Sequence, residues 1–374
     1  MTGEQSLASH LKICQITSAH PVTDIRIFYR ECRSLREAGH EVFLMAQHTK
    51  SEMMDGVKVV PLPPTRSRFI RILIYPWIIL FKALRRKADI YHFHDPELLF
   101  IGFVLKLFGK KVVYDVHENV PLQFATKTYL ISPIRWILKE VVRHIENTGV
   151  RFFDGIVTAT TGIKSRFPGK YSAKIEVIGN YVDPEDIKPA PYSQKTHSLC
   201  YTGVISYNKG IDMLIKSVEV NYLTLNLAGK FENEQDKHKI IKMEGWENVN
   251  YYGFIDREQV KSIYDQSYMG MLILRPWDAF LDAMPNKLFE YMAAGIPIVA
   301  SDFPLWKKII EGHNCGICVN PLNLHEITKA ISILIHNRSL ARKMGQNGRD
   351  MVLKKYNWQK EKIKLFELYR KIGY

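Results

Sequence analysis

The stretch Met284-Pro-Asn-Lys-Leu-Phe-Glu-Tyr-Met-Ala-Ala-Gly-Ile-Pro-Ile-Val-Ala-Ser301 indicates the fold class of this chain. Pro285 suits the first position of a helix, because its fixed φ fits there and its missing N–H costs no hydrogen bond. Gly295 is placed to end that helix, and the apolar run 296–300 is typical of a buried strand. The stretch therefore predicts half of an α/β unit, with a helix start whose free N–H groups favour a phosphate.

Length and composition predict two domains in a reducing compartment. A chain of 374 residues is too long for one ordinary core and suits two domains of roughly 150–200 residues. Because 46% of its residues are hydrophobic, both cores can be filled. We expect a cytoplasmic chain, because no apolar run reaches about 18 residues and the N-terminus lacks a signal-peptide pattern. The five cysteines are scattered, as free thiols are; Cys315 and Cys318 have CxxC spacing without a second pair, so we expect no metal site.

The charge balance predicts an acidic partner. Lysine and arginine number 52 against 38 acidic residues, a formal net charge of +14. Such an excess fits a nucleotide phosphate, an anionic lipid surface or nucleic acid. We expect no nucleic acid, because the chain carries no recognition motif or aromatic-rich RNA-binding signature.

Strand and helix patterns alternate along the whole chain. This alternation predicts parallel sheets covered on both faces. A polar, proline-bearing stretch at 183–193 interrupts it, so we expect domains at 1–185 and 186–374, with the last helix, about 357–374, packing back on the first. Two Rossmann-like domains facing a cleft would place a ligand there. Strands are expected at 11–17, 41–46, 57–60, 89–94, 111–117, 155–160, 174–182, 198–202, 223–228, 249–252, 269–274 and 296–300, and an early helix at 28–38.

Several short motifs, in their order and spacing, resemble the family 4 glycosyltransferases, which have the GT-B fold. The resemblance covers about residues 11–370. It implies a retaining enzyme without a cofactor that moves a sugar from a nucleoside diphosphate sugar, UDP favoured over GDP, to a saccharide or lipid-linked acceptor in surface glycan biosynthesis. A sugar-nucleotide epimerase of the same fold is the first alternative, and a nucleic-acid-binding protein is the second. The motifs lie at 20–26, 94–98, 114–118, 202–210, 228–229, 253–255, 282–295 and 345–349.

The resemblance implies a phosphate site in the C-terminal half. Lys209 matches the family's phosphate lysine, and the backbone amides near Asn286, Lys287 and Leu288 match diphosphate donors. Gly203 matches a glycine that the family often follows with arginine, but valine follows it here. Lys287 or Arg26 is therefore expected to supply the second cation. Because no Asp-x-Asp triplet lies near a strand end, we expect leaving-group stabilisation without a metal.

The sugar and ribose contacts are implied by an acidic pair. Glu290 matches the residue that holds the nucleotide ribose. Asp282 stands eight positions earlier, where the family commonly has a glutamate that contacts the donor sugar, and we assign it a catalytic role. Its side chain is shorter than that of glutamate, so Asp278 remains a competing candidate for the same role.

In the N-terminal half, histidines and one charged loop are the candidates. The loop at 18–26 presents His20, Asp24 and Arg26, which offer a base and a phosphate or acceptor contact; alternatively, Asp24 and Arg26 pair to fix the loop. His117 ends a predicted strand and matches a family histidine near the reacting sugar. His94 is the weaker candidate, because it alternates with a second histidine along one strand.

The segment 66–87 is apolar in its middle and basic at both ends, with Tyr75 and Trp77 inside it. Such a segment can lie in a membrane interface and bind an anionic surface. It can equally be a domain helix buried against the sheet. The first hypothesis predicts peripheral attachment to the inner face of the cell membrane.

Overall fold

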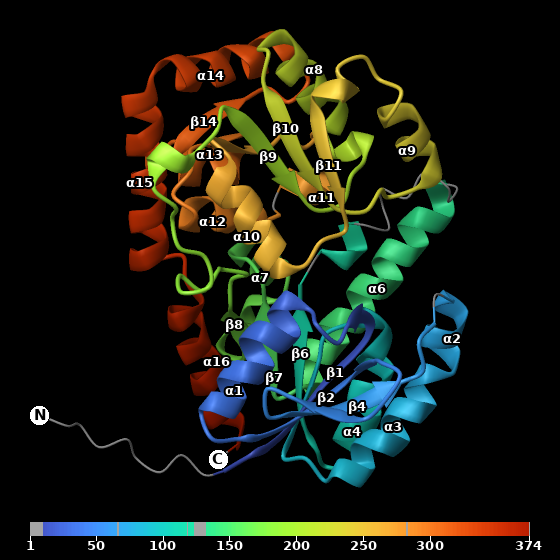
Figure 1. Cartoon of the computed structure of the whole chain (residues 1–374). Coiled ribbons are helices and arrows are strands. Elements are labelled where there is room, and N and C mark those ends of the chain that lie inside the picture. Colours follow the sequence, from blue (N-terminus) through green and yellow to red (C-terminus); the bar gives the residue numbers. More distant parts are fainter. Residues whose placement is uncertain (1–9, 66, 118, 123–131, 282, 374) are drawn as a thin grey trace, which may run out of the picture. The chain divides into compact units, whose positions relative to one another are not determined.

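The computed structural model describes residues 10–65, 67–117, 119–122, 132–281 and 283–373 (Figure 1). The chain forms two compact units: unit 1 is residues 1–179 and 359–374, and unit 2 is residues 180–358. The last helix, α16 (Trp358–Gly373), thus lies in unit 1 except for its first residue. It packs closely on the sheet there, since a Cβ added to Gly155 would lie 3.1 Å from Leu368.

Unit 1 is built on a sheet of eight strands in its described part, in the order β3-β4-β2-β1-β5-β6-β7-β8. Neighbours run parallel except β3, which pairs antiparallel with β4. Burial of β2 and β5 along their lengths is typical of a parallel sheet covered on both faces. The strands are β1 (Lys12–Pro21), β2 (Glu41–Gln47), β3 (Glu52–Met54), β4 (Val57–Leu62), β5 (Ile90–Phe93), β6 (Lys111–Val116), β7 (Gly155–Thr158) and β8 (Ile175–Val177).

The helices of unit 1 begin at local caps. The Asp24 carboxylate accepts from the N–H groups of Arg26 and Ile27, so the first helical segment starts at Ile25 rather than at 28. This segment is wound as a π-helix over Ile25–Cys32 and continues as α1 (Arg33–Glu37). The others are α2 (Arg68–Leu73), α3 (Tyr75–Arg86), α4 (Leu99–Leu107), α6 (Ser132–Phe152) and α7 (Thr161–Ser165), with short turns at Pro96–Leu98 and Gly169–Lys174.

Unit 2 has a six-stranded sheet in the order β11-β10-β9-β12-β13-β14, and all pairs of its described strands are parallel. Successive residues of β9 enter different cores: Leu199 and Tyr201 join one cluster and Cys200 the other. The sheet is therefore covered on both faces. The strands are β9 (Ser198–Thr202), β10 (Thr224–Ala228), β11 (Val249–Gly253), β12 (Met269–Leu272), β13 (Ile298–Ser301) and β14 (Gly316–Val319).

Helices connect the strands of unit 2 (Figure 1). The capping box of Asp256 and Gln259 fixes the start of α10. The helices are α8 (Ile211–Val220), α9 (Glu234–Ile240), α10 (Arg257–Gln266), α11 (Asp278–Leu281), α12 (Asn286–Ala293), α13 (Pro304–Ile310), α14 (Leu324–His336) and α15 (Arg338–Lys354), with short turns at Tyr192–Gln194, Tyr207–Lys209 and Trp246–Asn248.

Three details differ from the sequence predictions. Pro285 is the N-cap of α12, one position before the expected one, because its ψ of 139° is extended. The short strands β3 and β14 were not expected.

The CxxC cysteines flank the start of β14, and burial raises the pKa of both Cys315 and Cys318 to about 12. Their thiols are therefore protonated at neutral pH.

In the segment 66–87, whose first residue lies outside the described residues, α2 and α3 follow each other with Ile74 between them. Tyr75, Ile79 and Ala83 are buried in the core of unit 1. One face of α3 therefore packs against the core, as in an ordinary domain helix. Among the described residues, no helix is both long and apolar enough to cross a bilayer.

Candidate active site

Two glycines bring the loops after β9 and β10 into backbone contact. Gly203 has φ +140° and Gly229 has φ +142°, a region that favours glycine. A Cβ on Gly229 would lie 1.7 Å from the Gly203 carbonyl oxygen, and one on Gly203 would lie 2.5 Å from the Nζ of Lys287. Glycine at 203 therefore provides the space that the Lys287 ammonium occupies.

Helix α12 presents its N-terminus beside this loop. The N–H groups of Asn286 and Lys287 are in the first turn and have no acceptor within the helix. The N–H of Leu288 instead donates to the Pro285 carbonyl, 3.1 Å away, so it is already used by the helix. The Oδ1 of Asn286 is buried and finds no hydrogen-bond partner among the described residues. The helix start therefore holds an acceptor and two donors suited to a polar ligand.

Two lysines come together at this place from distant parts of the chain. Burial, together with the charge of Lys209, lowers the pKa of Lys287 to about 8, although the Glu290 carboxylate acts in the opposite direction. Lys209 lies in the turn before α8, with its Nζ 3.9 Å from the Phe280 ring centroid. Two ammonium groups close enough to disturb each other favour an anion, such as a diphosphate, between them.

The carboxylate of Glu290 is fixed by a buried tyrosine. The Tyr264 hydroxyl lies 2.9 Å from Glu290 Oε2 and 2.6 Å from Thr202 Oγ1. Glu290 is 8% exposed, so its position is set by these contacts rather than by solvent. Asp282, the other acidic candidate, lies outside the described residues. Asp278 is exposed at the first position of α11.

In unit 1, the C-terminal end of β1 places His20 between two carboxylates, where the sequence predicted a loop. His20 Nδ1 lies 3.3 Å from Asp24 Oδ2, and its Nε2 lies 3.5 Å from Asp95 Oδ1. The other Asp95 oxygen accepts from the N–H of Ser18 at 2.7 Å and from the Thr17 hydroxyl at 2.8 Å. Because the His20 side chain is 38% exposed, it can meet a ligand while the acids orient its ring.

Arg26 was expected to contact a phosphate or an acceptor, but the structure places it inside unit 1. Its Nε lies 2.9 Å from Asp115 Oδ2 and 3.1 Å from Glu31 Oε1, and the residue is 5% exposed. A guanidinium held by two buried carboxylates acts as their counterion. Arg26 therefore suits a structural role better than the acceptor or leaving-group contact expected of it.

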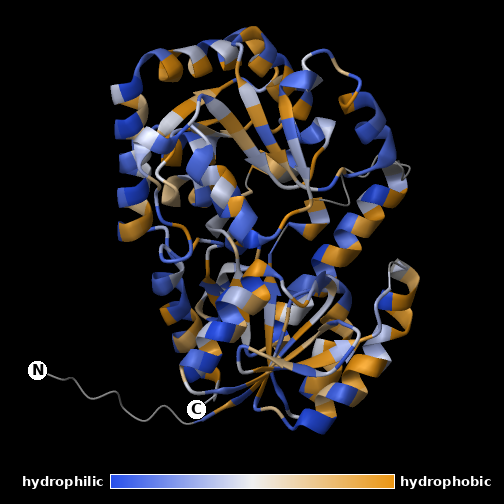
Figure 2. Ribbon diagram, in the orientation of Figure 1, coloured by the Kyte–Doolittle hydropathy of each residue, from blue (hydrophilic) through white to orange (hydrophobic). Residues whose placement is uncertain are grey.

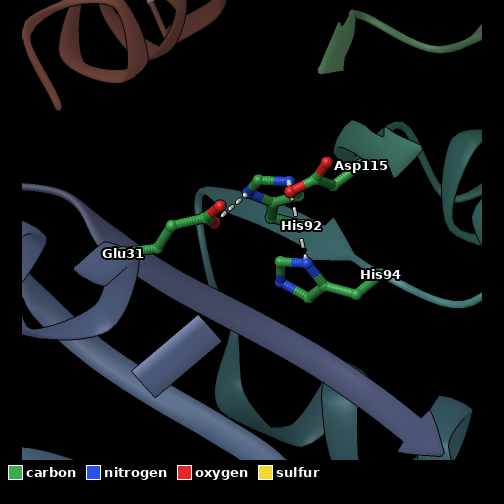
Figure 3. Close-up of side chains that lie close together, drawn as sticks. All are labelled: Glu31, His92, His94 and Asp115. Carbon is green, nitrogen blue, oxygen red and sulfur yellow. Dashed lines mark ion pairs between the residues drawn. The ribbon is translucent and has the colours of Figure 1, made fainter. Parts of the chain in front are cut away.

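Glu31, His92, His94 and Asp115 form a buried cluster on the sheet of unit 1 (Figure 3). One nitrogen or carboxylate oxygen from each residue lies within 4.8 Å of the others. Both this spacing and the residue types, histidine and carboxylate, fit a metal ion. Arg26, however, already contacts both carboxylates and is the counterion of Asp115. Against the effect of burial, its charge holds the pKa of Asp115 well below the usual range, whereas burial and the neighbouring Asp115 raise the pKa of Glu31. The cluster thus carries its own counterion.

His117 extends this cluster toward solvent. Its Nε2 lies 3.1 Å from Nδ1 of His94, and the two rings stack at 5.2 Å. Burial lowers the pKa of His117 to about 3, against the opposing charge of Asp115, so the ring is neutral at pH 7. The His20 ring lies 5.6 Å from it. His94 is 2% exposed and contacts other side chains rather than solvent, so it suits support of His117 more than ligand contact.

Sequence reasoning missed the residues that hold these groups in place. Tyr264 supports Glu290 from α10, and nothing in its local pattern indicates that contact. Gln15 and Asp115 were indicated in principle, because each is a polar residue within an otherwise apolar strand, where a buried partner is required. Tyr369 reaches the same cluster from the other end of the sequence.

Two family profiles match the chain in succession. Residues 26–186 match glycosyltransferase family 4, and residues 182–351 match the glycosyl transferases group 1. This chain belongs to the family 4, group 1 glycosyltransferases. The alpha-galactosylglucosyldiacylglycerol synthase of Streptococcus pneumoniae is 23% identical to this glycosyltransferase over 63% of this chain and 66% of that relative.

Solved structures show that this glycosyltransferase has the GT-B fold of two Rossmann-like domains. Sucrose-phosphate synthase from Thermosynechococcus elongatus matches with a TM-score of 0.78 at 15% identity, over 96% of this chain and 98% of that one. Anabaena HepE in complex with UDP-glucose matches with a TM-score of 0.74 at 14% identity, over 96% of this chain and 99% of that one. At such low identity the likeness shows the fold alone.

Proposed function

We propose that this glycosyltransferase is a retaining enzyme that transfers a sugar from a nucleoside diphosphate sugar, UDP favoured over GDP, to a saccharide or lipid-linked acceptor in surface glycan biosynthesis. The observation that carries the proposal is the cluster of Lys209, Lys287 and Glu290 at the start of α12. The retaining outcome is carried over from the family, and the preference for UDP rests on the UDP-glucose bound in Anabaena HepE.

In this proposal, unit 2 holds the donor. The diphosphate accepts from the first-turn N–H groups of α12 and from the ammonium groups of Lys209 and Lys287. Glu290 accepts from the ribose hydroxyls, and its fixed position favours one orientation of the nucleotide. Asp282 remains the candidate for the donor sugar on family grounds.

The lysines supply the chemistry that a metal supplies in other transferases. As the bond between the anomeric carbon and the phosphate oxygen breaks, negative charge grows on the diphosphate. Two cations placed beforehand stabilise that charge more than they stabilise the ground state, which lowers the barrier. The acceptor hydroxyl then bonds to the anomeric carbon, and its proton leaves with the diphosphate or passes to solvent. We therefore propose a metal-independent reaction.

We assign the acceptor and the reacting sugar to unit 1. His20, oriented by Asp24 and Asp95, is the exposed group that can contact an acceptor. His117 is neutral and partly exposed, which suits a contact with a sugar hydroxyl. A lipid-linked acceptor is favoured by one relative, which is named as a diacylglycerol glycolipid synthase.

The second partner that we propose is an anionic membrane surface, met at the cytoplasmic face by the segment 66–87. Phe69, Trp77 and Phe81 are 68%, 62% and 58% exposed, and the segment contains no acidic residue. Figure 2 shows hydrophobic and hydrophilic positions mixed along α2 and α3. The Arg85 guanidinium lies 4.0 Å from the centroid of the Phe81 ring, so apolar and cationic groups share one surface. Large apolar side chains beside cations are suited to a lipid interface.

Helix α4 extends this surface. The rings of Trp77 and Phe100 meet edge to face at 5.9 Å, and Leu107 at the end of α4 is 87% exposed. Arg71, by contrast, lies 3.6 Å from Glu97, so part of its charge is already paired. The cations left for lipid headgroups are mainly those at the end of α3, Arg85 and Arg86, with Lys87 after it.

One screen tests the proposed reaction. Purified protein is incubated with UDP-, GDP- and ADP-sugars together with simple saccharide and lipid-linked acceptors, and the released diphosphate is measured. The proposal predicts release from at least one nucleotide sugar, with UDP-sugars preferred, and stimulation by an acceptor. Binding of no nucleotide in a thermal-shift assay, together with no release, would contradict it.

A further inference from the structure

The hydroxyl of Tyr369, on the C-terminal helix α16, lies inside the histidine cluster of unit 1. It is 2.6 Å from Nδ1 of His92 and 3.1 Å from Nε2 of Gln15, and the residue is 1% exposed. Gln15 and His92 face each other across the β1–β5 pair. A residue near the end of the chain is thus bonded to the centre of the sheet.

These contacts fix the orientation of the Gln15 amide. Its Nε2 faces two oxygens, the Tyr369 hydroxyl and Glu31 Oε2 at 3.4 Å, so this end of the amide is the donor. The opposite end, Oε1, is then an acceptor and lies 2.7 Å from Nε2 of His94. A carbonyl oxygen at that distance requires a proton on His94 Nε2.

The same logic continues from His94 to His117. When Nε2 holds the single ring proton of His94, its Nδ1 is bare and accepts a hydrogen bond from His117 Nε2 at 3.1 Å. His117 is neutral, so its Nδ1 is then bare as well. Two other groups face these rings. The Oδ2 of Asp115 is 3.4 Å from His94 Nδ1 and already accepts from Arg26, while its Oδ1 is 3.8 Å from His117 Nδ1, beyond hydrogen-bond distance. The second group is the imidazole of His20.

We propose that Tyr369 and Gln15 are positioning residues that set the tautomer of His117, leaving its Nδ1 as a hydrogen-bond acceptor for a hydroxyl of the reacting sugar. The inference rests on the proposed glycosyl transfer for its functional meaning. The relay itself is a property of the apo protein, because each step is fixed by a donor and an acceptor within the described part of unit 1.

Histidine tautomers are directly measurable. In the full-length protein with ¹⁵N-labelled histidine at pH 7, two-bond ¹H–¹⁵N spectra distinguish the protonated from the bare ring nitrogen. We expect His94 and His117 both to carry their proton on Nε2, with signals assigned by single substitutions. An imidazolium at His94, or a proton on Nδ1 of either ring, in the wild-type protein would overturn the proposal.

The variant Tyr369→Phe removes the hydroxyl that anchors the relay. Tyr91→Phe is the matched control, since the Tyr91 hydroxyl is also buried in unit 1 and bonds only to backbone atoms of Ala83 and Ala88 among the described residues. We expect Tyr369→Phe to mix the tautomers of His94 and His117, whereas Tyr91→Phe leaves them unchanged. Identical spectra for the two variants would contradict the proposal, because the hydroxyl would then act on stability alone.

Activity gives a second readout with UDP-glucose as the probe donor. We expect Tyr369→Phe to lower kcat about fivefold, the size of one lost hydrogen bond, with the KM for donor unchanged. An equal loss in Tyr91→Phe would contradict a positioning role. If the wild type releases no UDP, the proposed reaction with this donor fails, while the spectra still decide the relay.

Discussion

The guanidinium of Arg26 and the carboxylate of Asp115 form a two-point ion pair inside unit 1, with Nε 2.9 Å from Oδ2 and Nη2 3.2 Å from Oδ1. The pair joins the helical segment after β1 to the strand β6. Arg26 also donates to the carbonyl of Ile178, so one side chain connects three parts of the unit. Its position explains how two acidic side chains remain buried beside three histidines.

Replacing Arg26 by methionine should strongly destabilise unit 1. The change leaves Asp115 buried without its counterion, which typically costs about 3–5 kcal/mol of unfolding free energy. Urea denaturation followed by circular dichroism measures this. Lys261→Met is the control, because Lys261 pairs with an 80%-exposed Glu258 side chain and should cost less than about 1 kcal/mol. Equal losses of unfolding free energy in the two variants would show that the buried pair stabilises the protein no more than a surface pair.

UDP should bind more weakly as the pH rises through about 8. Lys287 has its pKa lowered to about 8 in the free protein, and a diphosphate prefers its ammonium form. Below pH 8 the lysine is already charged, whereas above pH 8 binding must also take up a proton. Isothermal titration calorimetry across pH 7–9.5 shows the decline.

The variant Lys287→Met tests the origin of that pH dependence. It should weaken UDP binding at pH 7 and flatten the decline above pH 8. Lys195→Met is the matched control, since Lys195 is a buried lysine of unit 2 whose Nζ donates to the backbone of Tyr264 and Asp265. A decline that persists in Lys287→Met, or that disappears in Lys195→Met, would assign the titration to another group.

The sequence predicted the strands of both sheets because buried parallel strands are short apolar runs bounded by turn residues. Strands β3 and β14 escaped prediction for a physical reason. Glu52–Met54 is a partly exposed edge strand that pairs antiparallel with β4, and Gly316–Val319 begins with glycine and contains cysteine, so neither has a strong apolar pattern. Their strand form depends on neighbours in the sheet.

For the site, the sequence indicated residues but not their orientation. Lys209, Lys287 and Glu290 were each expected at the donor, and the charges of Glu290 and Lys209 both act on the pKa of Lys287, in opposite directions. Arg26 was expected at a ligand, yet its side chain turns into the sheet. That choice depends on Asp115, which lies 89 positions away in the sequence and cannot be recognised as a partner from local pattern.

Glu290→Ala should raise the KM for the donor, or lower turnover, at least tenfold. The lost charge-assisted contact to the ribose corresponds to roughly 1.5–3 kcal/mol. Steady-state kinetics with a thermal melt separates this effect from unfolding, because the change also leaves the Tyr264 hydroxyl with one partner fewer. Tyr264→Phe keeps the carboxylate and should lose less activity. Unchanged donor kinetics in folded Glu290→Ala would refute the assignment.

The protein should co-sediment with anionic vesicles and be released as salt rises. Each cation near the surface contributes up to about 1 kcal/mol, screened by salt, while neutral vesicles offer only the apolar contacts. Replacing Arg85, Arg86 and Lys87 by serine should weaken binding. Serine at Lys237, Lys239 and Lys242 of unit 2 removes the same charge elsewhere and should not. If the two triple variants co-sediment equally, or if the wild type does not bind vesicles, the proposed membrane-binding surface is contradicted.

In the proposed reaction, lysines rather than a metal stabilise the leaving diphosphate. The most direct measurement is the initial rate of UDP release from a UDP-sugar by the wild type and by Lys209→Ala, each with excess EDTA and with Mn²⁺. We predict that the wild type keeps its rate in EDTA and that Lys209→Ala loses about 10²-fold in either condition. Wild-type activity that vanishes in EDTA and returns with Mn²⁺, or Lys209→Ala at the wild-type rate, would contradict the account.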